Sequence, residues 1–160
     1  MFYKEMESPI GPLLLAGDHD ALRLLLFKRG RDKAKPKPEW EPDRSALKEP
    51  IKQLGAYFSG RLKDFDVPLA PGGTSFQTSV WEALQRIPYG ETISYGELAR
   101  RLGNPKAVRA VGLANGSNPI AIIIPCHRVI GSNGSLVGYG GGLPIKQALL
   151  AMERGQRRLL

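Results

Sequence analysis

Cysteine and histidine are scarce in this chain of 160 residues, which has one cysteine and two histidines. A single thiol, Cys126, cannot form an internal disulfide bond. Together with only His19 and His127, it cannot supply the four cysteine and histidine ligands of a structural zinc ion. We therefore expect no metal site. If Cys126 has a function, we expect it to act as a thiol.

Long apolar runs are also missing. No stretch of about 18 apolar residues is present, so we expect no membrane span. The longest apolar stretches, Leu13–Ala16 and Leu24–Phe27, have the length of strands. Lys4 and Glu5 interrupt the start of the chain and argue against a secretory signal peptide. The 42% of hydrophobic residues is enough for a core, and we expect a folded protein located in the cytoplasm.

Acidic residues are outnumbered by basic ones, 15 against 23, which gives a formal net charge of +8 and a pI near 9.8. A basic domain of this size favours a polyanionic partner such as nucleic acid. The alternative is that the charge only keeps the protein soluble.

The order of turns and apolar segments predicts an α+β fold. Residues 2–28 hold short apolar segments separated by turn signals, which is typical of a small antiparallel sheet. Residues 28–43 are charged and rich in proline and predict a long surface loop. A helix is expected over 44–58, although Pro50 conflicts with its early part.

The segment Pro71-Gly-Gly73 marks a change of composition. We take it as the boundary between an N-terminal domain, 1–70, and a mostly helical C-terminal domain, 71–160. Thr74 or Ser75 should cap the first helix of the second domain. The apolar face of that helix is Phe76, Val80, Trp81, Leu84 and Ile87.

Two short helices are expected between residues 92 and 116. Ser94 is placed to cap the first, with Glu97 three residues later as in a capping box. Pro105 would be the first residue of the second helix. Two helices joined by a tight turn are typical of a helix-turn-helix, although many helical hairpins share the pattern. The small residues expected on the inner face of the second helix are Ala107, Ala110, Val111 and Ala114.

Four basic side chains accompany this helix pair, namely Arg100, Arg101, Lys106 and Arg109. They favour a surface that faces DNA, and the alternative is an ordinary solvated helix face.

Cys126 and His127 are adjacent at the end of a strand-like apolar run, Ile120–Ile124. A thiol becomes a good nucleophile as the thiolate, which needs a base or a positive field nearby. His127 could act as the base directly or through water. Glu153, in a helix expected over 144–154, could orient its imidazole. The alternative is a buried and inert cysteine.

The longer string around the thiol decides between these interpretations. Asn118-Pro119, then Ile123-Ile-Pro-Cys-His-Arg-Val-Ile130, then Gly138-Tyr139 and Gly141-Gly142-Leu143 closely resemble the O6-alkylguanine-DNA alkyltransferase family, the methylated-DNA–protein-cysteine methyltransferases. The likeness continues upstream through Phe76-Gln, Val80-Trp, Ile87-Pro-Tyr-Gly90, Ile93-Ser-Tyr95 and Arg109-Ala-Val-Gly112, and so covers residues 75–155.

The resemblance implies DNA repair by direct reversal. Such a protein enters the minor groove and flips a guanine with an O6-alkyl group out of the duplex. It then transfers the alkyl group to its own cysteine, once per molecule and without a cofactor. The expected partner is double-stranded DNA carrying O6-alkylguanine, with O4-alkylthymine as a second candidate lesion. The protein is expected to be a monomer.

The resemblance also implies residue roles. Cys126 corresponds to the alkyl acceptor, His127 to a base that acts through water, and Glu153 to the carboxylate that completes the relay. Tyr95 corresponds to the residue that gives a proton to the leaving guanine. Asn118 corresponds to the hinge ahead of the active-site loop.

The remaining implied residues bind DNA or form the lesion pocket. Arg109 would fill the gap left by the flipped base. The other expected DNA contacts are Ala107, Ala110, Arg128, Arg100, Arg101 and Lys106. The pocket would be formed by Tyr139, Val129, Gly140 and Gly141, where position 140 is glycine although some relatives have serine.

Three other functions fit parts of the pattern. A lesion-binding alkyltransferase-like protein would lack the acceptor cysteine, which is present here. A helix-turn-helix regulator needs a dimer or a sensor domain, and neither is evident. A cysteine hydrolase normally brings its Cys and His together from distant segments rather than from adjacent positions.

Overall fold

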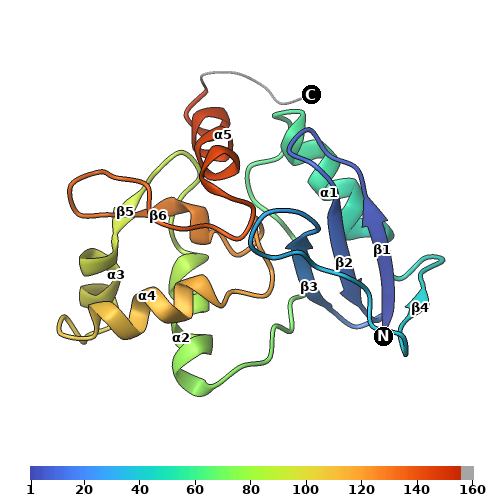
Figure 1. The fold of residues 1–160 in the computed structure, drawn as a ribbon, viewed down its shortest axis with the longest axis horizontal. Helices are drawn as coiled ribbons and strands as arrows, with labels where there is room; N and C mark the ends of the chain where they lie inside the picture. The colour runs from blue at the N-terminus through green and yellow to red at the C-terminus, as the bar shows by residue number, and fades with distance from the viewer. Residues whose placement is uncertain (156–160) are drawn as a thin grey trace.

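The computed structural model describes residues 1–155. A sheet and one helix form one side of the molecule, the remaining helices form the other, and long loops lie between them (Figure 1). The expected α+β class is confirmed. No helix within the described residues is long and apolar enough to cross a membrane.

The N-terminal sheet has four strands in the order β3-β2-β1-β4. β1 (Phe2–Met6) and β3 (Leu22–Phe27) pair antiparallel with the central β2 (Leu13–Gly17), which is buried throughout its length. The short β4 (Glu41–Pro42) lies parallel to β1 and comes from the end of the loop expected over residues 28–43. The predicted meander of three strands is therefore present, and the fourth strand is an addition.

α1 (Lys48–Phe58) begins later than expected. The carboxylate of Asp43 accepts hydrogen bonds from the backbone N–H groups of Ala46 and Leu47, both at 2.9 Å, and so holds a turn before the helix. Pro50 then occupies the first helical turn, where no N–H group has a partner within the helix. The conflict noted for Pro50 is resolved by this shift of the helix start.

The C-terminal part begins with α2 (Ser75–Leu84), which Thr74, one of the two expected caps, begins with a complete capping box. α3 (Tyr95–Arg101) follows the two-residue strand β5 (Ile93–Ser94), and the Ser94 hydroxyl accepts the N–H of Glu97 at 3.0 Å. The capping box expected here is incomplete, because the Glu97 carboxylate pairs with Arg100 and Arg101 instead.

α4 (Val108–Gly116) starts three residues after Pro105, so the expected helix start is wrong. The residues just before it form a turn, in which the N–H of Ala107 bonds to the carbonyl of Asn104 at 3.0 Å. Of the four small residues expected on the inner face, Val111 and Ala114 are buried, Ala107 is half-buried and Ala110 is exposed.

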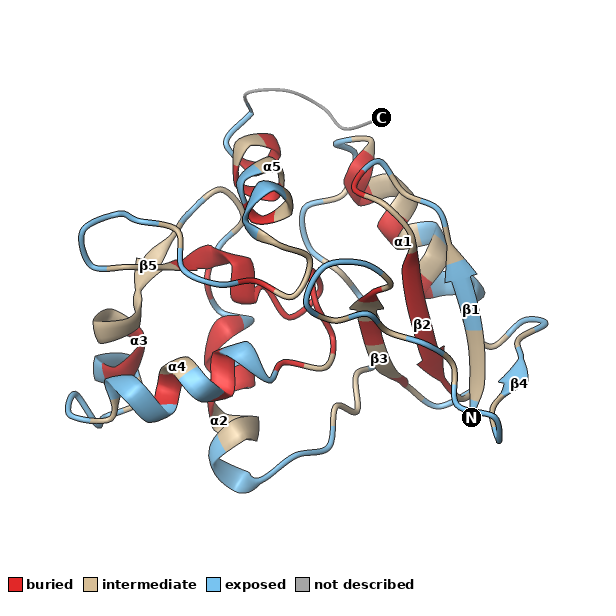
Figure 2. Cartoon of the chain, in the orientation of Figure 1, coloured by how far each residue is buried: buried red, intermediate tan, exposed pale blue. Residues whose placement is uncertain are grey.

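The segment before Cys126 is not the expected strand. Residues 121–123 form turns, and Ile122 has a φ of +70°, which a β-branched side chain rarely adopts. Cys126–Arg128 then form one turn of 3-10 helix, followed by β6 (Val129–Ile130), which pairs with β5. This turn is buried (Figure 2). The final helix, α5, spans Leu143–Glu153.

One apolar core joins both parts of the chain. Leu25 of β3 forms an isolated bridge with Ile120, and its N–H bonds to the carbonyl of Pro119 at 2.9 Å. The Trp81 indole N–H bonds to the carbonyl of Ala114 at 2.9 Å and fixes α2 against α4. The sheet and the helices therefore position the turn at Cys126 jointly.

Two loops meet beside this core with very little space between their backbones. The N–H groups of Arg31 and Asp32 both bond to the carbonyl of Gly140, at 2.8 and 3.0 Å. A Cβ atom on Gly140 would overlap the Asp32 carboxylate, and one on Gly141 would lie 3.0 Å from the ring of Phe27. The glycine at position 140 is therefore a steric requirement of this chain.

Replacement of Gly140 by alanine should lower the free energy of unfolding by about 1–3 kcal/mol, because the new methyl group must displace Asp32. Chemical denaturation measures this loss. The loss should shrink in an Asp32→Ala background, which removes the obstructing carboxylate. Gly55→Ala on α1 is the control, since nothing lies within 4 Å of its added Cβ, and it should stabilise the helix. An equal loss in both backgrounds would contradict the steric explanation.

Candidate active site around Cys126

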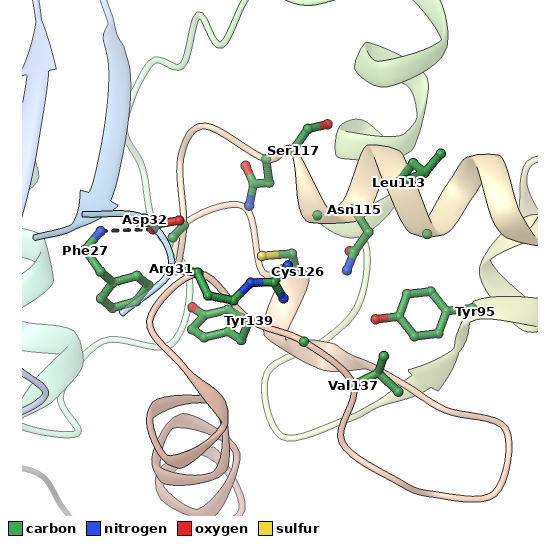
Figure 3. A pocket seen from close by; sticks show the side chains of 16 residues that line it. Phe27, Arg31, Asp32, Tyr95, Leu113, Asn115, Ser117, Cys126, Val137 and Tyr139 are labelled. Carbon is green, nitrogen blue, oxygen red and sulfur yellow. Dashed lines mark hydrogen bonds between the residues drawn. The ribbon is translucent and has the colours of Figure 1, made fainter. Parts of the chain in front are cut away.

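A cavity of about 540 Å³ opens beside Cys126. Its wall combines the end of α4, the loop that carries Tyr139, and the loop from the N-terminal part that carries Arg31 and Asp32 (Figure 3). Tyr95 at the start of α3 lies at the end of the cavity away from Asp32. The volume is that of a typical small-ligand pocket.

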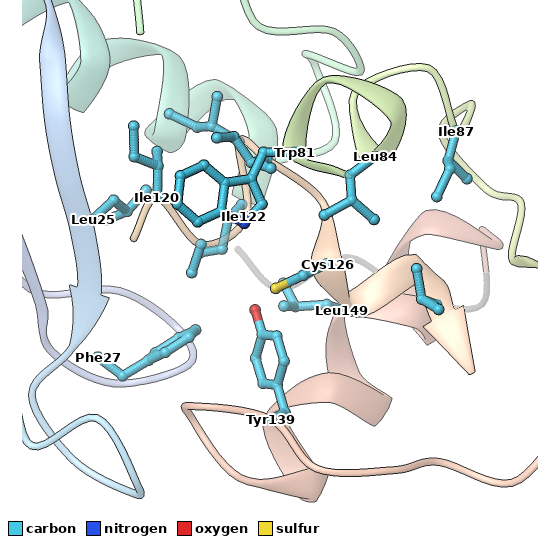
Figure 4. Close-up of a cluster of buried hydrophobic side chains, with 14 of the residues drawn as sticks. Leu25, Phe27, Trp81, Leu84, Ile87, Ile120, Ile122, Cys126, Tyr139 and Leu149 are labelled. Carbon is cyan, nitrogen blue, oxygen red and sulfur yellow. The ribbon is translucent and has the colours of Figure 1, made fainter. Parts of the chain in front are cut away.

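The Cys126 side chain is buried and has no disulfide partner. The side chains of Leu84, Leu149 and Tyr139 lie around it (Figure 4). Burial raises the pKa of the Cys126 thiol to about 11, against the lowering influence of Asn118 and Lys146. The resting protein therefore holds a protonated thiol, and a base must remove its proton before it can act as a nucleophile.

The buried carboxylate of Glu153 lies next to His127, the residue that follows Cys126. Glu153 Oε2 is 2.8 Å from His127 Nε2, and both side chains are almost completely buried. Arg128 donates through Nε to Glu153 Oε1 at 2.8 Å and through Nη2 to Oε2 at 3.0 Å. The hydroxyl of Tyr57, on α1, donates to Oε2 at 2.5 Å.

The bonds around Glu153 fix the protonation of its partners. Burial alone would raise the pKa of Glu153, but His127 and Arg128 outweigh burial and hold it well below its usual range. A carboxylate can only accept hydrogen bonds, so His127 carries its proton on Nε2. Burial also lowers the pKa of His127. The imidazole is therefore neutral, and its buried Nδ1 has no partner among residues 1–155.

Arg128 is not on the surface, and the prediction that it contacts DNA is wrong. It is 6% exposed, and its guanidinium is held by Glu153 and by the carbonyl of Ile87 at 2.7 Å. Its neighbour in sequence, His127, occupies the same buried turn. The basic residue type suggested a DNA contact, whereas its partner lies 25 residues further along the chain.

Tyr95 and Asn118 both line the cavity. Burial raises the pKa of Tyr95, and the nearby amide of Asn115 opposes the rise. Asn118 donates through Nδ2 to the carbonyl of Ile124 at 2.8 Å and accepts the N–H of Ile120 at 3.0 Å. It thereby braces the loop that leads to Cys126.

Only two of the four expected pocket residues lie in the wall of the cavity. Tyr139 and Gly140 line the cavity, whereas Val129 and Gly141 are not in its wall. The carbonyl of Val129 accepts a hydrogen bond from the buried Lys146 Nζ at 2.8 Å. Gly141 instead lies against Phe27.

Sequence reasoning missed several residues of this site. Arg31 and Asp32 belong to the loop that composition marked only as a surface loop, and Asn115 lies on a helix face that looked ordinary. Tyr57 is a buried helix residue whose partner, Glu153, is 96 positions away. No local signal distinguishes these residues, because their roles come from contacts between distant segments.

The predicted DNA-facing residues other than Arg128 lie on the outside of the helix pair. Arg109, Lys106 and Ala110 are exposed and Ala107 is half-buried. Arg100 and Arg101 are exposed but both pair with Glu97. Within residues 1–155 no group of acidic, cysteine and histidine side chains could hold a metal ion.

Comparison with known proteins points to one family. Residues 75–155 match the 6-O-methylguanine DNA methyltransferase, DNA binding domain, and residues 1–71 match the ribonuclease-like domain of the same family. A methylated-DNA–protein-cysteine methyltransferase of Methanosarcina acetivorans is 58% identical over 153 residues, which is 96% of this chain and 98% of the relative. One from Mycobacterium tuberculosis is 53% identical over 155 residues, 96% of this chain and 93% of the relative.

The crystal structure of M. tuberculosis OGT in complex with DNA superimposes with a TM-score of 0.91, at 52% identity and over 99% of this chain and 96% of that one. The chain therefore belongs to the 6-O-methylguanine DNA methyltransferase family. It is an enzyme of direct-reversal DNA repair, of the class that moves a methyl group from DNA to a cysteine of the protein itself.

Replacement of Glu153 by glutamine should cost about 3–5 kcal/mol of stability at neutral pH, because it leaves the buried Arg128 without its counter-charge. Because the pKa of Glu153 is lowered in the folded protein, its contribution is present above the unfolded pKa and is lost as the pH falls. The difference in the free energy of unfolding between the variant and wild type should therefore narrow below about pH 4. Urea denaturation at several pH values measures this difference.

Glu97→Gln is the matched control, because Glu97 also pairs with guanidinium groups, those of Arg100 and Arg101, but at a partly exposed site. Its loss should be much smaller, since solvent and salt screen that pair. Equal losses at the two sites would show that burial of the Glu153 network does not matter for stability.

Proposed function

We propose that Cys126 is the residue that accepts the alkyl group. The observation that carries this proposal is that the only thiol of the chain lies in the wall of the cavity, next to a buried His127–Glu153 pair. In the transfer, the Cys126 sulfur forms a bond to the alkyl carbon, and the bond between that carbon and O6 of guanine breaks. The electron pair of the broken bond goes to the guanine.

His127 supplies the base for this step. Its neutral imidazole has a buried Nδ1 free to take the thiol proton, directly or through water, while Nε2 stays bonded to Glu153. Assistance from a general base is typically worth about 10²–10⁴-fold in rate. The hydroxyl of Tyr95, at the opposite side of the cavity, gives a proton to the guanine as it leaves.

The substrate is double-stranded DNA carrying O6-alkylguanine, with O4-alkylthymine as a second candidate. The target atom cannot be reached inside the base stack, so the nucleotide must be flipped into the cavity. α3 and α4 act as the helix-turn-helix, and the exposed Arg109, Lys106 and Ala110 face the minor groove. We further propose that the protein is a monomer located in the cytoplasm.

Incubation with a duplex that contains one O6-methylguanine should add one methyl group to Cys126 and then stop, because the thioether product is stable. Intact mass and peptide mapping measure the number and the site of methyl groups. Cys126→Ser should bind the same duplex and gain no mass. Methylation at another residue, or continued turnover, would contradict the proposal. A protein that binds the lesion and gains no mass would instead be a lesion-binding relative without transfer activity.

Arg109→Ala should slow repair of a fully paired duplex by at least tenfold, because the flipped base leaves a gap that a planar guanidinium fills and unstacking costs a few kcal/mol. Reaction with the free O6-alkylguanine base should be nearly unchanged, since nothing needs to be flipped. Single-turnover rates with the two substrates measure the difference.

Lys106→Ala serves as the control for charge, because it removes a neighbouring exposed cation without removing a planar group. Arg109→Lys should rescue the duplex reaction only partly. Equal slowing on the duplex and on the free base would show that Arg109 has a structural role.

A further inference from the structure

A buried tyrosine from the N-terminal part of the chain contacts the carboxylate of the proposed relay. Tyr57 lies near the end of α1, is 0% exposed, and packs against Phe58, Phe65 and Tyr89. Its hydroxyl donates to Glu153 Oε2 at 2.5 Å. No step of the proposed transfer uses this side chain.

The Tyr57 hydroxyl shares its acceptor atom with the relay histidine. Glu153 Oε2 receives the Tyr57 hydroxyl, His127 Nε2 and Arg128 Nη2, while Oε1 receives Arg128 Nε. Every donor that stabilises the ionised carboxylate takes up part of its negative charge. Less of that charge is then available to stabilise a proton on His127.

The hydroxyl can act only as a donor here. Burial, and then the negative charge of Glu153, raise the pKa of Tyr57 well above its usual value. The phenol therefore remains protonated around neutral pH, where it donates to the carboxylate. Its position between α1 and α5 also holds the carboxylate in one orientation.

We propose that Tyr57 is a positioning residue of the transfer reaction, whose hydroxyl orients Glu153 and limits its pull on His127, so that the imidazole stays neutral and ready to accept the thiol proton. This inference rests on the proposed role of His127 as the base. It makes the N-terminal part of the chain a contributor to the chemistry, in addition to its part in the core.

The groups that face His127 determine how a substitution at Tyr57 changes the pKa of the imidazole. Glu153 of α5 raises its pKa, whereas Arg128 on the same turn and Lys146 of α5 lower it. The ring of Tyr139 lies 6.4 Å away, edge-on. Tyr57→Phe removes one uncharged donor from Glu153 and leaves all of these charges and the aromatic packing in place. The unshared negative charge should then raise the pKa of His127.

The test is the pH dependence of methyl transfer by the full-length protein in single turnover, with a duplex carrying O6-methylguanine as the probe. Between pH 5 and 9, Tyr57→Phe should move the rising limb of the rate to higher pH by about half a unit to one unit. The plateau at high pH should stay within about threefold of wild type, because His127 is neutral there in both proteins. NMR titration of the His127 imidazole should show the same upward shift without substrate.

Tyr89→Phe is the matched control, because it removes a hydroxyl from the same aromatic cluster, and that hydroxyl has no hydrogen bond to Glu153 within the described residues. Its pH profile and His127 titration should coincide with wild type. A site-specific 3-fluorotyrosine at position 57 keeps the fold and makes the phenol a stronger donor. It should therefore move both curves to lower pH.

Unchanged curves for Tyr57→Phe would overturn the inference. A loss of rate that is uniform over all pH values, with an unchanged His127 titration, would also overturn it and leave Tyr57 as a packing residue. A failure of the proposed role of His127 as the base can be told apart from a failure of this inference. If His127 is not the base, His127→Gln should transfer the methyl group at the wild-type rate. The NMR titration of the Tyr57 variants would still report the effect of Tyr57 on His127.

Discussion

The burial of one negative charge determines much of this structure. A carboxylate as deeply buried as that of Glu153 is tolerated only when other groups satisfy its lone pairs and balance its charge. Two segments supply these groups to Glu153 of α5: α1 brings Tyr57, and the turn after Pro125 brings His127 and Arg128. The turn that carries Cys126 is thereby fixed between the two parts of the chain. The bond from His127 also fixes which nitrogen carries the proton, while burial lowers the pKa of the imidazole.

Close contact between two loops is the second constraint. The carbonyl of Gly140 accepts two N–H groups from the loop at Arg31 and Asp32, and the glycine leaves no room for a side chain. One wall of the cavity therefore depends on the N-terminal part, although Cys126 and His127 are in the C-terminal part. The local steric reason for glycine at this position is the Asp32 carboxylate.

Many elements could be predicted from sequence because their signals are local. The three strands of the first sheet, the cap at Thr74 and the cap at Ser94 depend on residues only a few positions apart. The predictions from sequence were wrong where contacts between distant segments outweigh the local conformational preference of the residues. Ile120–Ile124 has the composition of a strand, but Asn118 and burial among the helices fold it into turns with Ile122 at positive φ. Arg128 has the charge of a DNA contact, but a buried carboxylate holds it inside.

The sequence by itself determined the chemistry that is available: one thiol, an adjacent imidazole, a carboxylate in the last helix and a basic helix pair, in an order that resembles one family of repair proteins. It could not determine which polar groups meet, because hydrogen bonds between side chains depend on packing rather than on separation along the chain. Tyr57 and Glu153 are 96 residues apart and touch only because α1 and α5 enclose the same core. The tertiary structure alone decided that the Glu153 carboxylate accepts four hydrogen bonds, and that one of them comes from the N-terminal part of the chain.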